Sequence, residues 1–141
     1  MIIALDTNCI LPGRVGGIES HVVGIVEALL GAADRVRRLV LVTRPENDAL
    51  FRGYEGKRCV AVLQDRPVLD GEPIRNWAAV LAERPTEGRQ LLETFQRDKL
   101  GLLRRVGTDV VHFPGSAEAE FAVFVDFVVA DPVVAVTSAG G

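Results

Sequence analysis

Features that mark several classes of protein are scarce or missing in this sequence. Its 141 residues include only two cysteines, Cys9 and Cys59, which lie far apart and have no neighbouring histidine. This spacing fits neither a disulfide framework nor a zinc site, and it is typical of reduced thiols in a cytoplasmic protein. The sequence has no run of charges of one sign, and its net charge is −3. Charge therefore gives no reason to expect binding to nucleic acid or to an anionic membrane.

No apolar run is long enough to cross a bilayer comfortably. The most apolar stretch, residues 121–136, contains Asp126, Asp131 and Pro132, so we exclude a transmembrane helix there. At the start of the chain, Asp6 interrupts the first apolar run and no basic segment precedes it, so we expect no signal peptide.

The residues that are present indicate one soluble globular domain over residues 1–141. Apolar residues make up 48% of the sequence and charged residues 25%. A domain of this size buries roughly 70% of the surface that its unfolded chain exposes, which is enough for a real core.

Apolar runs alternate with helical patterns along the chain. Five short apolar runs predict strands at 2–6, 38–43, 58–63, 109–113 and 132–137. Apolar spacing predicts a helix from Ile18, a short helix within 44–53, a turn of helix near 77–82, and a long helix at 87–106 capped by Thr86. Residues 118–130 have apolar residues that suit either a strand or a helix.

This alternation predicts an α/β fold, a three-layer Rossmann-like domain with a mainly parallel sheet of about five or six strands. Right-handed crossovers favour the strand order 3-2-1-4-5. In that order the chain leaves strands 1 and 4 on opposite sides of the sheet. Ligands bind above such a switch point, so the loops 7–17 and 112–116 are expected to line one cleft.

The loop after the first strand contains Gly13, Gly16 and Gly17 directly before a helix. The spacing is neither the dinucleotide fingerprint nor a P-loop. A glycine pair that opens a helix leaves backbone N–H groups free, and the helix dipole favours an anion such as phosphate. The alternative interpretation is a tight turn that needs positive φ.

The stretch "GRVGGIESHVVGIVEALL" resembles the opening of glycosyltransferase family 4, whose members have the GT-B fold. "RLVLVTRPEN", "LLRRVGTDVVHFPGS" and "PVVAVT" resemble later parts of the same N-terminal domain, in the same order. The resemblance covers most of residues 1–116. It implies a retaining transfer of a sugar from a nucleotide sugar to an acceptor, without a metal or another cofactor.

The resemblance also implies roles for particular residues. Gly16 and Gly17 match the loop that approaches the phosphate and sugar of the donor, and His112 matches a position where an imidazole can bind a sugar hydroxyl. Arg14 and Asn8 lie in the same loop and are further candidates for binding the acceptor or the sugar. For His112 the alternative is a half-buried residue at a strand end, and for Arg14 and Asn8 it is a solvated loop.

The donor pocket of the family belongs to a second domain that carries a Glu-x7-Glu motif. Glu19 and Glu27 have this spacing, but they lie on the first predicted helix, about 80° apart around its axis, and are best read as surface groups. We therefore expect the 141 residues alone to be inactive. A domain of this type without its last crossover helix would expose sheet surface and favour self-association through its C-terminal edge.

Two further functions stay open. "ALDTNCIL" resembles the first strand of PIN-domain nucleases, in which acidic side chains bind a divalent metal that activates water. Asp6 would be one ligand, with Asp109, Asp126 or Asp131 as others. The third possibility is a Rossmann-like module that binds a sugar or a partner chain without catalysis.

Overall fold

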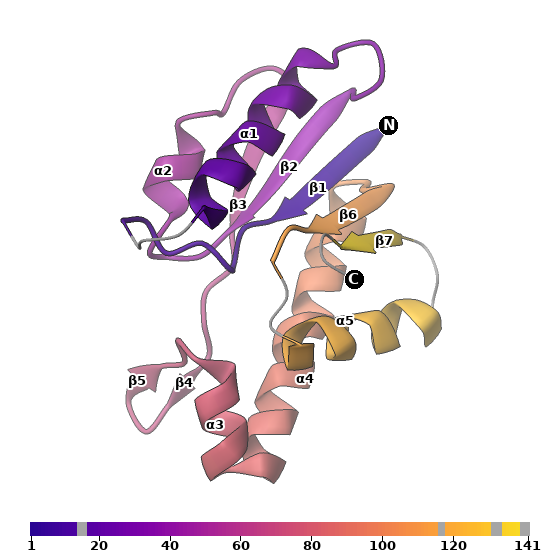
Figure 1. Ribbon diagram of the computed structural model, residues 1–141. Helices are drawn as coiled ribbons and strands as arrows, with labels where there is room; N and C mark the ends of the chain where they lie inside the picture. The colour runs from indigo at the N-terminus through magenta and orange to yellow at the C-terminus, as the bar shows by residue number, and fades with distance from the viewer. Residues whose placement is uncertain (14–16, 116–117, 131–133, 139–141) are drawn as a thin grey trace.

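A computed structural model describes residues 1–13, 17–115, 118–130 and 134–138 (Figure 1). Its centre is a five-stranded parallel sheet in the order β3-β2-β1-β6-β7. The strands of this sheet are β1 (Ile2–Asp6), β2 (Arg38–Thr43), β3 (Cys59–Leu63), β6 (Val110–Phe113) and β7 (Ala135–Ser138). The predicted α/β class and the order 3-2-1-4-5 are confirmed, because β6 and β7 are the fourth and fifth strands of the sheet.

Helices cover the two faces of the sheet and give the fold three layers (Figure 1). One face is covered by α1 (Ile18–Gly31) and α2 (Asp48–Arg52), and the other by α4 (Pro85–Arg105) and α5 (Glu118–Ala130). Alternation along β2 shows why its apolar run is continuous. Leu39 and Leu41 pack on the α1 side, whereas Val40 and Val42 pack on the α4 side. A strand that is buried on both faces has no polar face.

The chain between β3 and α4 lies beyond the sheet, next to the carboxyl ends of its strands. It forms a small antiparallel hairpin, β4 (Val68–Leu69) and β5 (Glu72–Pro73), and the short helix α3 (Trp77–Glu83). The helix α4 has 21 residues and is about 32 Å long, so its first half extends past the sheet. A third apolar cluster joins α3, α4 and α5 there and contains Ile74, Trp77, Leu92, Phe95 and Val123. This cluster holds α3 over the carboxyl edge of the sheet.

Two local predictions are changed by the structure. The long helix begins at Pro85 with Arg84 as its N-cap, so Thr86 is not the cap. Proline suits the first helical turn because its missing N–H would have no partner there. Residues 118–130, for which strand and helix were both open, form α5. In α5, Phe124 and Val128 are buried four residues apart against the sheet, whereas Val129 is exposed.

The sheet is not equally covered along its width. On the α1 side of β6 and β7, His112 is half-buried and Ala135 and Thr137 are exposed. Within the described part of the chain, no helix lies over this part of the sheet (Figure 1). Of the helices that the structure describes, none combines the length and the apolar content needed to cross a membrane.

Candidate functional site

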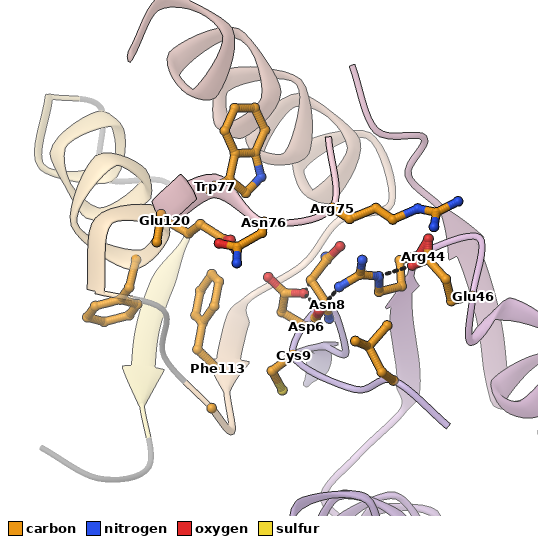
Figure 2. A pocket seen from close by; sticks show the side chains of 14 residues that line it. Asp6, Asn8, Cys9, Arg44, Glu46, Arg75, Asn76, Trp77, Phe113 and Glu120 are labelled. Atoms are coloured by element: carbon orange, nitrogen blue, oxygen red, sulfur yellow. Dashed lines mark hydrogen bonds and ion pairs between the residues drawn. The ribbon is translucent and has the colours of Figure 1, made fainter. Parts of the chain in front are cut away.

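A cavity of about 620 Å³ lies at the carboxyl ends of β1, β2 and β6, beneath the start of α3 (Figure 2). This is the switch point of the sheet, where the sequence placed a cleft. Four segments supply its lining. The residues are Asp6, Asn8, Cys9 and Leu11 after β1; Arg44 and Glu46 after β2; Arg75, Asn76, Trp77 and Ala78 around the start of α3; and Phe113, Gly115, Glu120 and Phe121 from β6 to α5.

A buried ion pair joins the end of β1 to α4 beside the cavity. Lys99 Nζ donates to Asp6 Oδ2 at 2.6 Å, and both side chains are almost fully buried. The other carboxylate oxygen, Oδ1, accepts from the backbone N–H of Asn8 at 2.8 Å and from the Asn8 side chain. The Lys99 ammonium also lies near the rings of Phe95 and Phe113. Both oxygens of Asp6 are therefore occupied by protein groups.

Asn8 connects two arginines to this pair. Its Oδ1 accepts from Arg66 Nη2 at 3.0 Å, and its backbone oxygen accepts from Arg44 Nη1 at 2.9 Å. Asn8 was expected either in the binding site or as a solvated loop residue, and the structure places it in the lining, buried. Asn8 thus helps to fix the positions of three charged groups, Asp6 and Arg66 through its side chain and Arg44 through its backbone oxygen.

Asn47 fastens the loop after β2 to the loop after β1. Its Nδ2 donates to the backbone oxygens of Thr7 at 2.7 Å and Ile10 at 3.0 Å, and its Oδ1 accepts from the backbone N–H of Arg44. Because Asn47 is fully buried, these bonds are shielded from water. They hold Arg44 at the cavity wall.

The two guanidinium groups have unused hydrogen-bond donors. Arg44 is 4% exposed and pairs through Nε with Glu46, but its Nη2 is buried and has no partner among the described residues. Arg66 is also buried, and within the same part of the chain its Nε and Nη1 have no partner. Burial, followed by the charge of Arg44, lowers the pKa of Arg66. Trp77 is fully buried, and its indole Nε1 is a fourth donor that no described residue accepts from.

Two other ionisable groups in the lining have raised pKa values. Burial raises the pKa of Glu120, while Arg66, Lys99 and Arg44 act in the opposite direction. Burial and the charge of Asp6 raise the pKa of Cys9 to about 11. Cys9 is therefore a protonated thiol near neutral pH and is not poised as a nucleophile.

Of the glycine loop, the structure describes Gly13 and Gly17, and it places the start of α1 near the cavity. Gly17 precedes α1 with φ −72° and ψ −4°, and a Cβ built on it meets no heavy atom of the described residues within 4 Å. Within the described part of the chain, neither the backbone conformation nor the packing requires glycine at this position, in contrast to Gly13, whose φ is +82°. The next residue, Ile18, approaches Gly115 of the cavity lining, because a Cβ on Gly115 would lie 3.5 Å from Ile18 Cδ1. Gly16 and Arg14 lie outside the described residues.

His112 points away from the cavity, although its neighbour Phe113 lines it. Its Nδ1 shares a hydrogen bond of 2.8 Å with Thr137 Oγ1 on the less covered face of the sheet. Burial, followed by the charge of His21 on α1, lowers the pKa of His112. The structure therefore brings Asn8 to the cavity, puts Gly17 beside it, and puts His112 on the other face of the sheet.

The aspartates named as metal ligands do not gather around Asp6. Asp109 lies at the amino end of β6, where its carboxylate accepts from the backbone N–H of Ile2 at 2.7 Å. Asp126 is exposed on α5, and Asp131 lies outside the described residues. Among the residues described, no three His, Cys, Asp or Glu side chains are close enough together to hold a metal ion. Glu19 and Glu27 lie on α1, as expected.

Sequence reasoning missed the charged residues that shape this site. Arg44 follows directly after the apolar run of β2, and a charged residue there is at the ligand-binding end of a parallel strand. Lys99 occupies a core position of α4, four residues after Phe95 and four before the buried Leu103. A lysine on the apolar face of a helix is itself a signal that a buried partner exists.

Comparison with known proteins adds no family to this geometry. No family model, no curated protein and no solved structure matches the chain. The function is therefore argued from the cavity and the residues around it.

Proposed function

We propose that this chain is the acceptor-side domain of a retaining glycosyltransferase that resembles family 4. In this proposal the cavity at the switch point holds the acceptor, and the start of α1 at Gly17 meets the diphosphate and sugar of the nucleotide-sugar donor. The lining suits a polyhydroxylated molecule, since it combines carboxylates, amides and two guanidinium groups with aromatic side chains. The reduced state of Cys9 and Cys59 is in keeping with a cytoplasmic location.

One observation carries the proposal. Gly17 opens a helix beside the cavity, yet neither its φ nor any atom of the described residues near it requires glycine. A ligand that packs against the main chain gives a reason for the missing Cβ, because a side chain there would occupy the ligand's place. The free N–H groups of a helix start then suit a phosphate.

Donor binding tests this proposal. We expect UDP-hexoses or GDP-hexoses to bind the intact chain weakly, as seen in amide NMR shifts near the start of α1. Gly17→Val should abolish these shifts without lowering the melting temperature. Gly24→Val is the matched control, because Gly24 lies on the same helix and also has open space around its Cβ position.

Two results would contradict the proposal. One is that no UDP-hexose or GDP-hexose causes a saturable shift. The other is that Gly17→Val binds the donor as well as the wild-type chain does. After either result, a binding module without sugar transfer becomes the better description of this chain.

We also propose that copies of this chain associate through β7. This strand is at the edge of the sheet and contains neither charge nor proline over Ala135–Ser138. An edge strand without such protection presents unpaired backbone groups to another copy.

A further inference from the structure

The cavity contains buried hydrogen-bond donors that the protein leaves unused. Arg44 Nη2 and Trp77 Nε1 belong to residues of the lining, and neither finds a partner among the described residues. Leaving a buried donor without an acceptor is unfavourable. Figure 2 shows the Arg44 guanidinium among the polar side chains of the cavity, whereas the ring of Trp77 lies among the helices beside it. What the cavity lacks near Arg44 is a hydrogen-bond acceptor.

The cations around the cavity are not equally paired. Three of them are buried: Lys99 is paired with Asp6, and Arg44 with Glu46, but Arg66 has no carboxylate of the described residues within ion-pair distance. Arg66 is instead held by the neutral side chain of Asn8. A buried cation is normally in direct contact with an anion, so Arg66 favours a further negative group nearby.

Two further ionisable groups lie at the rim. Arg75 is exposed, lines the cavity, and extends over it toward Glu46 (Figure 2). Glu120 approaches from the α5 side and has no hydrogen bond or ion pair through its carboxyl group within the described part of the chain. Burial raises the pKa of this carboxyl group, while the charges of Arg66, Lys99 and Arg44 act in the opposite direction. Arg75 thus adds a positive charge at the rim of the cavity.

We propose that the cavity binds a small molecule through an oxyanion, a phosphate or carboxylate group that accepts hydrogen bonds from Arg44 and is balanced by the charge of Arg66 and Arg75. A cavity of about 620 Å³ has room for a hexose that carries such a group. The inference rests on the proposed function only in identifying this ligand as the sugar acceptor.

Three hexoses of similar size test the site, with binding to the intact chain measured by calorimetry. Glucose 6-phosphate carries a phosphate, glucuronate carries a carboxylate, and glucose carries neither. We expect at least one of the two anions to bind ten times more tightly than glucose or better. Tighter binding of glucose 6-phosphate identifies the group as a phosphate, and tighter binding of glucuronate identifies it as a carboxylate.

Variants test the role of Arg44. Arg44→Gln is expected to weaken binding of the preferred anion about 10-fold to 100-fold, in line with the loss of a charge-assisted hydrogen bond. Arg105→Gln removes the same charge at the amino end of the sheet and should leave affinity unchanged. If Arg44→Gln does not fold, Glu46→Gln tests the role of Arg44 instead. It removes the carboxylate that competes with the ligand for Arg44, so it should tighten anion binding.

Two results would overturn the inference. One is that neither anion binds more tightly than glucose. The other is that Arg44→Gln and Arg105→Gln have equal effects, or that Glu46→Gln weakens anion binding. The donor experiment fails separately: if hexose anions bind and nucleotide sugars do not, the oxyanion site stands and the sugar-transfer proposal fails. Gly17→Val should leave binding of the hexose anion intact.

Discussion

At the scale of single residues, the ion pair between Asp6 and Lys99 has the largest expected effect on stability, because both side chains are buried. It joins residues 93 positions apart and removes both charges from water. A buried pair adds little stability compared with apolar residues of the same shape, but removing one partner leaves an unpaired buried charge. The pair therefore makes the positions of α4 and of the cavity wall depend on each other.

Lys99→Met should lower the free energy of unfolding by about 3–5 kcal/mol, because the Asp6 carboxylate then lies buried without its cation. Adding Asp6→Asn should restore part of this loss, since the second change removes the unpaired charge. Urea unfolding at neutral pH measures both effects. Arg89→Met is the control: it breaks the exposed pair with Glu93 on the same helix and should cost less than about 1 kcal/mol. Equal losses for Lys99→Met and Arg89→Met would contradict this prediction.

Glu120 should make stability depend on pH. Burial raises the pKa of this carboxyl group, so the folded chain holds the proton more tightly than the unfolded chain does. The stability that this tighter proton binding contributes is fully present below pH 4.5, the ordinary pKa of a glutamate. It is lost as the pH rises through the higher pKa that Glu120 has in the folded chain. Glu120→Gln cannot ionise, so its melting temperature should exceed that of the wild-type chain at neutral pH and match it in acid.

The exposed Glu83, at the end of α3, is the control for this measurement. Glu83→Gln should leave the difference between acid and neutral melting temperatures as it is in the wild-type chain. A melting temperature for Glu120→Gln that falls below the wild-type value at neutral pH would mean that the Glu120 carboxylate is stabilised by the nearby cations.

At the scale of elements, the long helix α4 has two glycines in different surroundings. A Cβ on Gly101 would meet nothing within 4 Å, whereas a Cβ on Gly88 would lie 3.0 Å from Val80 Cγ1 and 3.3 Å from the Val80 carbonyl oxygen. Gly88 thus lets α3 pack closely against α4. Its small size serves the contact that holds α3 above the cavity.

Gly101→Ala should raise the free energy of unfolding by about 0.5–1 kcal/mol, because alanine loses less backbone entropy in a helix. Gly88→Ala has the same advantage in a helix, but the new methyl group must push Val80 away. The free energy of unfolding of Gly88→Ala should therefore be lower than that of Gly101→Ala, by at least about 1 kcal/mol. Thermal unfolding of the two variants compares them directly. If they are equally stabilised, α3 and α4 are not packed through Gly88.

The type of an element could be predicted where its apolar residues have either strand spacing or helix spacing, but not where they fit both. The buried strands show as apolar runs, whereas α5 has apolar residues at both strand and helix spacing, and only its packing against β6 and α4 decides between them. The β4–β5 hairpin has two residues in each strand, too few for any pattern. Its signal is the turn itself: Asp70 and Gly71 both have positive φ, as an Asp-Gly hairpin turn requires.

The location of the candidate site was predictable, but its chemistry was not. Strand order fixes the cleft at the carboxyl ends of β1 and β6, and Asn8 was placed in its loop. The cluster of Arg44, Arg66 and Lys99 depends on contacts across 36, 58 and 93 positions of the chain. Such contacts leave no periodic trace in a single sequence, because each side chain alone looks like a surface charge.

At the scale of the whole molecule, the uncharged edge strand β7 is expected to let copies of this chain associate. Ala135→Lys places a charge on the exposed side of this edge, so it should lower the fraction of dimers and larger species at high protein concentration. Sedimentation velocity over a range of concentrations measures that fraction. Ala28→Lys adds the same charge on the exposed side of α1 and should leave assembly unchanged. Equal effects of the two variants, or a wild-type chain that sediments as a monomer throughout, would contradict association through β7.

The position of β1 at the centre of the sheet has a consequence for the newborn chain. β1 is made before the other strands of the sheet and gains β2 as a neighbour early, but β6 begins about 70 residues after β2 ends. At roughly 5–20 residues per second, a ribosome needs on the order of 3–14 s to supply those residues. Throughout that interval one edge of β1 is bare, and for most of it Lys99, the partner of Asp6, has not been made. Synthesis is therefore the stage at which this protein is most exposed to wrong pairing, and the stage at which a chaperone would have most to shield.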